Sequence, residues 1–173
     1  MTPTEPASPP YDPKLAALFA ANVREAERVA QNLRASLRRT AHLLPLDGAL
    51  LEQLDDEGKE RLDAFRVRFA DLQDLLAGKV FRSLLLLAEE QTISQLDVLN
   101  AMEKRRIIPS FQAWKRLRDL RNIFMHDYPE HAQERAEALT LAVAGAPELL
   151  AVLDRTMAYA KDRIGLRVAP GRH

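Results

Sequence analysis

The spacing of apolar residues limits the fold of this chain more than any other feature. Over residues 12–164, apolar side chains recur three or four positions apart, which places them on one face of an α-helix. No stretch shows the sustained alternation of apolar and polar residues that is typical of a half-buried strand. The sequence therefore predicts an all-α protein, an up-and-down helical bundle of about five main helices, with residues 12–164 forming a single domain.

Proline, glycine and capping residues divide this pattern into helices. Asp12 before Pro13 predicts a helix start, and Ser110 predicts another. The predicted helical segments span residues 12–43, 49–54, 55–90, 94–104 (capped by Thr92 or Ser94), 110–126 and 130–163. Gly145-Ala146-Pro147 leaves open whether the last is one kinked helix or two. The helix over 12–43 is an addition that either covers the bundle or extends a dimer interface.

The ends of the chain and its composition set further expectations. Four prolines in the first eleven residues predict a disordered arm over 1–11, and residues 165–173 are expected to form a flexible tail. The chain has no cysteine, which excludes disulfides and thiolate metal sites. The longest apolar run noted, residues 84–88, is too short to span a bilayer, and the start lacks the features of a secretion signal. We expect a soluble cytoplasmic protein that binds no membrane and needs no cofactor.

One stretch, residues 117–129, carries chemically capable side chains at a meaningful spacing. A helix from Ser110 would carry an apolar stripe formed by Phe111, Trp114, Leu117, Phe124, Met125 and Tyr128. Arg121 falls within this stripe, so its guanidinium must be paired or must face a cleft or a partner, since burying an unpaired charge costs several kcal/mol. Pro129 disfavours helix at the residue before it, which predicts that the helix ends near His126 and that the imidazole turns back toward Arg121.

These residues spell Arg-Asn-x-x-x-His-x-Tyr, from Arg121 and Asn122 through His126 to Tyr128. The pattern resembles the signature of the HEPN superfamily, specifically the HepT-like toxins that pair with minimal nucleotidyltransferase antitoxins in toxin-antitoxin systems. The resemblance implies a metal-independent endoribonuclease that works as a homodimer. It implies catalytic roles for Arg121 and His126, a supporting role for Asn122, and modification of Tyr128 with AMP (AMPylation) by the antitoxin.

The chemistry of RNA cleavage fits these residue types. Cleavage without a metal needs a base for the 2′-hydroxyl proton, an acid for the leaving oxygen, and positive charge on the transition state. Histidine can serve either proton-transfer role, and arginine has a charged fork that matches phosphate oxygens. One chain supplies one motif histidine, so a composite site at a two-fold dimer interface is a chemical requirement of this interpretation.

A basic segment leads into the motif. Between Lys104 and Arg121 the chain has seven basic residues and one acidic residue, Asp119, within an overall formal net charge of zero. On the helix itself, Lys115 and Arg118 are the candidate contacts to RNA phosphates. The alternative is an ordinary solvated helix face.

Each site residue also has a purely structural interpretation. Arg121 would then pair with a carboxylate such as Glu60 or Asp63, His126 would be a histidine at a helix C-terminus, and Tyr128 a half-buried aromatic residue. Two other functions follow from these alternatives. One is a non-catalytic nucleotide- or RNA-binding module that serves as the partner subunit of a nucleotidyltransferase; the other is a helical dimerisation protein. No spacing of His, Asp or Glu indicates a metal site.

Overall fold

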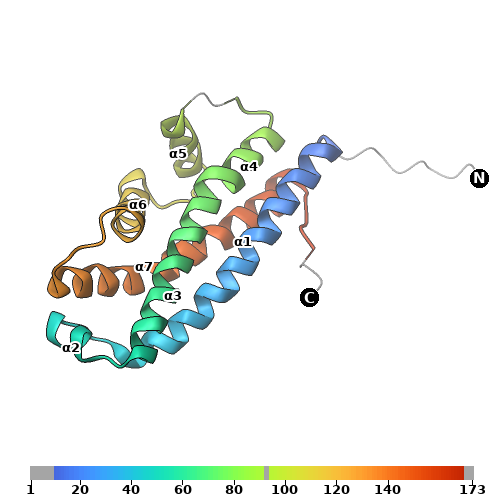
Figure 1. Cartoon of the computed structure of the whole chain (residues 1–173). Helices are drawn as coiled ribbons and strands as arrows, with labels where there is room; N and C mark the ends of the chain where they lie inside the picture. The colour runs from blue at the N-terminus through green and yellow to red at the C-terminus, as the bar shows by residue number, and fades with distance from the viewer. Residues whose placement is uncertain (1–9, 92–93, 170–173) are drawn as a thin grey trace, which may run out of the picture.

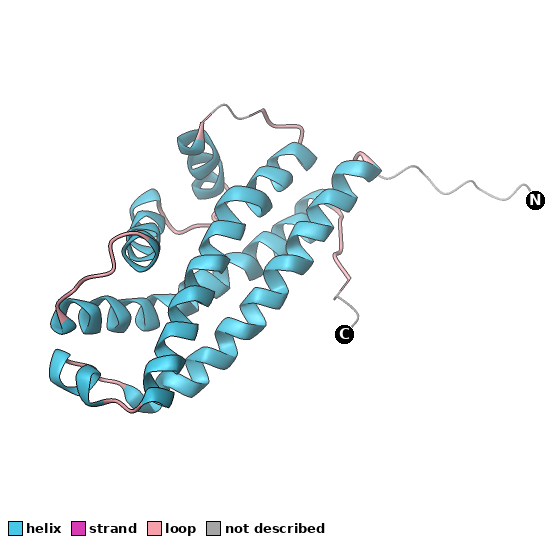
Figure 2. Ribbon diagram, viewed as in Figure 1, coloured by secondary structure: helices cyan, strands magenta, loops and turns pink. Residues whose placement is uncertain are grey.

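The structure is a computed structural model that describes residues 10–91 and 94–169. The described residues contain no strand, which confirms the all-α prediction (Figure 1, Figure 2). The helical elements are α1 (Pro13–Thr40), η1 (Ala41–Leu43), α2 (Gly48–Gln53), α3 (Asp56–Leu75), η2 (Leu76–Val80), α4 (Phe81–Leu87), α5 (Gln95–Lys104), α6 (Phe111–Met125), α7 (Ala132–Tyr159) and η3 (Ala160–Ile164). Residues 1–9 of the predicted arm, Thr92 as a possible cap and residues 170–173 of the predicted tail lie outside the described residues.

The predicted helix starts are confirmed by their capping hydrogen bonds. Asp12 Oδ1 accepts a hydrogen bond from the backbone N–H of Lys14 at 2.7 Å, and Pro13 occupies the first turn of α1. Ser110 Oγ accepts from the backbone N–H of the third residue of α6 at 3.0 Å. Ser94 closes a capping box at the start of α5. These side chains satisfy N–H groups that have no partner within the helix.

The long helix predicted over 55–90 is present as α3, η2 and α4 in succession. The turn between α3 and α4, Leu76–Val80, is π-helical. Gly78 lies within this turn and has open space beside its Cα, so no close contact requires a glycine there. Apolar residues spaced three or four positions apart predict one buried side of this long helix, and all of them are buried: Leu62, Phe65, Phe69, Leu72, Leu76, Val80 and Leu84. With α3–α4 taken as one helix and the short α2 set aside, the five main helices of the prediction are present.

Helix α1 packs against α3 and α7 and belongs to the core, so it covers the bundle rather than standing apart from it. It runs alongside α3 and α4 in the opposite direction (Figure 1). Phe19, Val23 and Leu33 are fully buried in this interface. The apolar spacing along residues 12–43 predicts Leu18 on the same side as these residues, but Leu18 is 45% exposed, so that prediction is wrong.

Helix α7 is one helix, although Pro147 lies inside it. Pro147 is on the exposed side of the helix. Proline has no backbone N–H, so the carbonyl group four residues earlier loses its partner in the helix, and on this side water can take that place. The helical segment Ala132–Ile164 is long and apolar enough to cross a membrane by length and composition, with a mean hydropathy of 1.6 in its most apolar window, half of which is buried. By mean hydropathy, the apolar segment long enough to span a bilayer is therefore this helix and not residues 84–88. Its buried residues form much of the core.

Both ends of the described chain pack against the bundle, so the expectation of a loose arm and tail does not hold for Tyr11, Leu166 and Val168. Gly165 has φ +83°, a left-handed conformation that glycine adopts without steric cost and that ends the helix. The chain then turns back, so that Leu166 and Val168 pack against the core. Tyr11, just before α1, packs against it as well.

Candidate active site

Buried aromatic residues hold α6 against the long helix α3–α4. The rings of Phe124 and Phe69 meet edge to face at 5.8 Å, and those of Trp114 and Phe81 lie 5.1 Å apart. Because the C-terminal part of α6 meets α3 and its N-terminal part meets α4, the two helices run antiparallel. Met125, expected in the apolar stripe, is instead 45% exposed.

The end of α6 lies where the sequence predicts it. His126 is the C-cap residue, with φ −127°, and its backbone N–H donates to the Asn122 carbonyl at 2.9 Å. Arg66 of α3 donates from Nη1 to the carbonyl oxygen of Phe124 at 2.9 Å. This bond satisfies one of the carbonyls that a helix end leaves without a partner. Both contacts fix the position from which the His126 side chain leaves the helix.

The predicted return of the imidazole toward Arg121 is confirmed. Arg121 Nη1 lies 3.0 Å from His126 Nε2 and donates to Asn122 Oδ1 at 3.2 Å. A guanidinium nitrogen can only donate, so Nε2 must be the acceptor in this contact. The geometry therefore corresponds to a neutral imidazole with its proton on Nδ1, and Nε2 is the nitrogen directed at the arginine.

The carboxylate that pairs with Arg121 is Asp74, and the suggested partners Glu60 and Asp63 are wrong. Arg121 Nη2 donates to Asp74 Oδ2 at 2.6 Å. Asp63 lies 3.3 Å from Arg66 instead. The physical reason is the antiparallel arrangement of α3 and α6, which places Arg121 beside Asp74, roughly 16 Å further along α3 than Asp63 at the usual rise per residue.

We call Arg121, Asn122, His126 and Asp74 the Arg121 cluster. The Arg121 side chain is 21% exposed and that of Asp74 is 47% exposed, so solvent reaches the cluster. Arg121 Nε is buried and has no hydrogen-bond partner among the described residues. The cluster thus presents a fixed positive charge beside a neutral imidazole, a combination that can bind a phosphate group and accept a proton.

Tyr128 faces a different groove from the Arg121 cluster. The Arg66 guanidinium lies over its ring at 4.2 Å from the centroid, and the Phe124 ring meets it at 6.3 Å. Burial raises the pKa of the Tyr128 hydroxyl, with Arg66 and Arg135 opposing the rise and Asp63 adding to it. The groove beside Tyr128 has a volume of about 310 Å³, is lined by residues of α2, α3 and α7, and contains none of the three polar motif residues.

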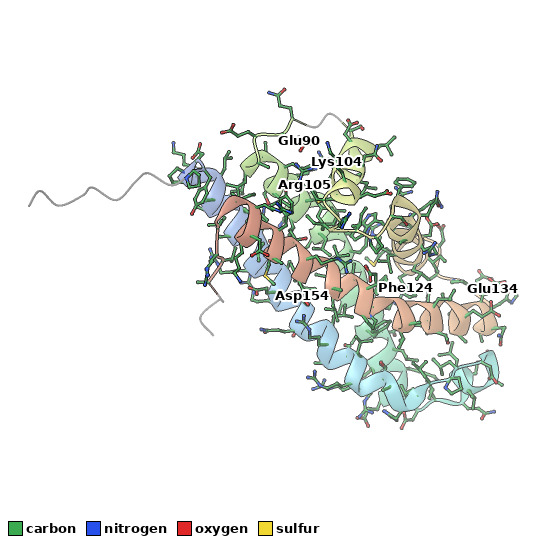
Figure 3. All side chains as sticks on the ribbon, turned by 180° about the vertical axis from the view of Figure 1, so that it is seen from behind. Glu90, Lys104, Arg105, Phe124, Glu134 and Asp154 are labelled. Atoms are coloured by element: carbon green, nitrogen blue, oxygen red, sulfur yellow. The ribbon has the colours of Figure 1, made fainter. Side chains whose placement is uncertain are left out.

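The basic residues before the motif do not form one surface. Lys115 Nζ pairs with Asp119 Oδ2 at 2.6 Å. Arg105 pairs with Glu90 near the ends of α4 and α5 (Figure 3). In the described part of the chain Arg118 makes no hydrogen bond or ion pair, and its Nε is buried. Arg118 is therefore the better candidate for a phosphate contact, and Lys115 would first have to leave Asp119.

The sequence analysis missed the acidic side of the site. Asp74 and Asp71 line a groove of about 450 Å³ between α1 and the long helix, together with Glu25 and Lys79. Burial raises the pKa of the Asp71 carboxyl, and the negative charge of Asp74 raises it further. No signal in the sequence marks these aspartates, because only the packing of α6 on α3 brings one of them to Arg121.

Replacing Asp71 by asparagine should stabilise the protein near pH 7 and have little effect at low pH. A raised carboxyl pKa means that the folded state disfavours the ionised form, so the penalty is absent below about pH 3, where both states are protonated, and present above the folded pKa. Both aspartates are solvent-exposed, which keeps the gain below about 1 kcal/mol. Urea unfolding of both proteins at pH 3 and pH 7 measures it; an equal or larger gain at pH 3 would contradict the pKa shift.

In the described ranges, no group of three or more His, Cys, Asp or Glu side chains is arranged to hold a metal ion. No family model, curated protein or solved structure matches the chain. The argument for function therefore depends on the geometry of the Arg121 cluster and on the motif that it contains.

Proposed function

We propose that the protein is a metal-independent endoribonuclease of the HEPN type, a cytoplasmic toxin that acts as a homodimer and is held in check by a minimal nucleotidyltransferase antitoxin. The observation that carries the proposal is the 3.0 Å approach of Arg121 Nη1 to His126 Nε2 at the end of α6. It joins the two proposed catalytic side chains of the motif across a helix end, whereas their spacing of five residues in a continuous helix would have pointed them apart.

In this mechanism His126 acts as the base. A neutral imidazole can take the proton of an RNA 2′-hydroxyl, but Nε2 would first have to exchange its contact with Arg121 for one with that hydroxyl. Arg121 would bind the scissile phosphate and stabilise the charge that develops on it. Asn122, through its 3.2 Å hydrogen bond, orients the guanidinium. The His126 side chain of a second copy would protonate the leaving oxygen, for which that imidazole would have to be in its protonated form and released from its own Arg121, because an imidazolium cannot accept a hydrogen bond.

Exposed apolar side chains beside the site support the dimer. Val67 is 44% exposed and lies on the same face of α3 as Asp71 and Asp74, by the spacing of helical residues. Met125 is 45% exposed and follows Arg121 by one turn of α6. A second copy that covers Val67 and Met125 would bring two Arg121 clusters together, as the chemistry requires.

The proposed control by an antitoxin acts through Tyr128. A tyrosine hydroxyl is protonated at neutral pH, and burial raises the pKa of Tyr128 further, so the transferase would have to supply the base that activates it. Transfer of AMP to that oxygen would add a negative charge and a bulky nucleoside beyond the end of α6, in the groove between α2, α3 and α7. Such a group would repel RNA as it approaches the motif.

The test is cleavage of a mixed RNA substrate by the purified protein in EDTA, with the oligomeric state measured by light scattering and the mass of Tyr128-containing peptides checked. We expect cleavage that survives EDTA and a dimer in solution. A dimeric protein that carries no modification and cleaves none of the RNA would contradict the nuclease proposal.

A second candidate is a non-catalytic partner subunit of a nucleotidyltransferase, and the Asp74 ion pair favours it. With Nη2 held by Asp74 at 2.6 Å, one arm of the Arg121 fork is already occupied and cannot bind a phosphate without exchange. In that case the protein would bind the transferase, and its Arg121 would hold a nucleotide or have a structural role. Stable complex formation without any RNA cleavage would distinguish this function from the first.

A further inference from the structure

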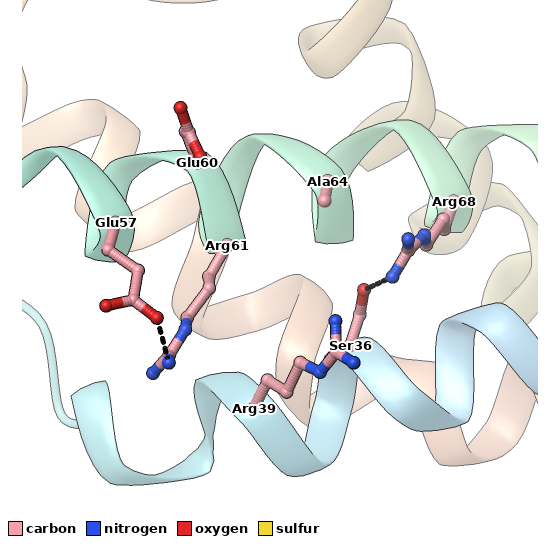
Figure 4. A pocket seen from close by; sticks show the side chains of 7 residues that line it. All are labelled: Ser36, Arg39, Glu57, Glu60, Arg61, Ala64 and Arg68. Atoms are coloured by element: carbon pink, nitrogen blue, oxygen red, sulfur yellow. Dashed lines mark hydrogen bonds and ion pairs between the residues drawn. The ribbon is translucent and has the colours of Figure 1, made fainter.

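A second groove, on the side of α3 that packs against α1, gathers arginines that the proposed function does not use. Its volume is about 500 Å³. We call it the Arg39 groove, after the most exposed of its arginines. Its polar lining residues are Ser36 and Arg39 from α1, and Glu57, Glu60, Arg61 and Arg68 from α3 (Figure 4).

The charges in this groove do not balance one another locally. Arg61 pairs with Glu57 at 2.5 Å. Glu60 points away from the guanidinium groups of the groove in Figure 4. Neither Arg39 nor Arg68 has an ion pair among the described residues. The lining has three arginines and two glutamates, so the groove carries an excess of positive charge, and within the described ranges neither Arg39 nor Arg68 is bound to a carboxylate.

A buried hydroxyl positions one of these arginines. Ser36 is 2% exposed, and its Oγ accepts a hydrogen bond from Arg68 Nη1 at 2.6 Å. The same nitrogen lies 3.4 Å from the carbonyl oxygen of Asn32. Figure 4 shows the guanidinium groups of Arg39 and Arg68 converging on Ser36 from the two helices. The two guanidinium groups repel each other, and an anion that bound between them would relieve this repulsion.

We propose that the Arg39 groove binds the phosphate group of a small phosphomonoester. A terminal phosphate carries a charge of about −1.5 to −2 at pH 7, whereas the phosphodiester of an RNA backbone carries only one charge, so the terminal phosphate is attracted more strongly by Arg39 and Arg68. Arginine forks bind phosphate oxygens through paired N–H donors. A groove of about 500 Å³ is of the size of small-molecule sites, so it has room for the rest of such a ligand.

The Arg39 groove is independent of the Arg121 cluster. Arg39 and Arg68 line the groove between α1 and α3. Arg121 lies on α6 and pairs with Asp74, which is not a lining residue of that groove. The proposal therefore stands whether or not the protein cleaves RNA. An activity test of the Arg121 cluster and a binding test of the Arg39 groove can fail separately.

The experiment is an NMR titration of the full chain with inorganic phosphate, with AMP as a phosphomonoester, and with adenosine as the ligand that lacks the phosphate. We expect backbone amide shifts at Ser36 and Ala64 with AMP and phosphate and none with adenosine. Tighter binding of AMP than of phosphate would identify an organic phosphomonoester as the ligand. Equal binding would identify free phosphate, which meets the same two arginines.

Variants of adjacent arginines make the test specific. Arg39→Gln should weaken AMP binding at least about tenfold, because a charge-assisted hydrogen bond is lost. Arg38→Gln changes the neighbouring exposed arginine, which does not line the groove, and should leave binding within about twofold. Arg68→Gln serves as a second variant on α3, with its fold checked by the spectrum.

Four outcomes would overturn the proposal. The first is the absence of shifts at Ser36 and Ala64 with millimolar phosphate or AMP. The second is equal weakening by Arg38→Gln and Arg39→Gln, which would mean a diffuse charge effect. The third is binding of RNA at the groove without binding of AMP. Shifts that vanish in Arg121→Gln but persist in Arg39→Gln would place the phosphate in the Arg121 cluster and likewise refute it.

Discussion

Replacing His126 by alanine should lower RNA cleavage in EDTA by at least about 100-fold, because one general acid–base group contributes about 10² to 10⁴ in rate. The fold should remain intact. His126 is exposed and caps α6 through its backbone N–H, which alanine retains. Arg121 keeps its bonds to Asn122 and Asp74 in the variant, so the binding of RNA phosphate should suffer less than the rate. Initial rates at saturating RNA, with thermal melting of both proteins, measure the two effects separately.

The matched control is His131→Ala. His131 is also exposed and lies just beyond the motif, as the N-cap residue of α7 with no side-chain capping bond. We expect its cleavage rate to stay within about twofold of the wild type and its stability within about 0.5 kcal/mol. Full activity of the folded His126→Ala protein would remove the histidine from the mechanism. An equal loss in both variants would show that the assay follows something other than His126.

The local parts of this site could be predicted from sequence because they depend on neighbouring residues. Ser110 starts α6 through its own hydroxyl, and Pro129 prevents the helix from continuing, so both ends follow from short-range rules. The approach of His126 to Arg121 then follows, since the chain leaves the helix at His126. The buried seam of α3 was predictable for the same reason, since a period of 3.6 residues marks one helix face.

What the sequence could not provide is the relative placement of helices. Asp74 and Arg121 are 47 positions apart, and only the register of α6 on α3 selects Asp74 over Asp63. The spacing of apolar residues marks which side of a helix is buried. How far the neighbouring helix extends over that side decides whether a residue at its edge, such as Leu18 or Met125, is covered. The packing of Leu166 on the core depends likewise on where η3 ends in space. Each of these is a tertiary property that no short-range rule encodes.

Replacing Phe124 by alanine should destabilise the protein by about 3–5 kcal/mol, the usual range for truncating a buried aromatic residue. Phe124 is 2% exposed and is labelled in Figure 3. Its ring meets Phe69 at 5.8 Å and Tyr128 at 6.3 Å, so the cavity would lie between α6, α3 and the segment that follows α6. Such a loss is a large share of a typical total stability of about 5–15 kcal/mol. Urea unfolding at pH 7 measures it.

Met125→Ala is the control for Phe124→Ala, since it removes an apolar side chain of similar size from the next position, where 45% is exposed. As a monomer it should lose less than about 0.5 kcal/mol. In the proposed dimer Met125 is covered. The variant should therefore lose more stability at protein concentrations at which the wild type is dimeric than at concentrations at which it is monomeric. A loss of 3 kcal/mol or more at all concentrations in Met125→Ala would mean that this face of α6 packs within one chain. A small loss in Phe124→Ala would mean that α6 is not anchored through its C-terminal turn, and the geometry of Arg121 and His126 would then need another support.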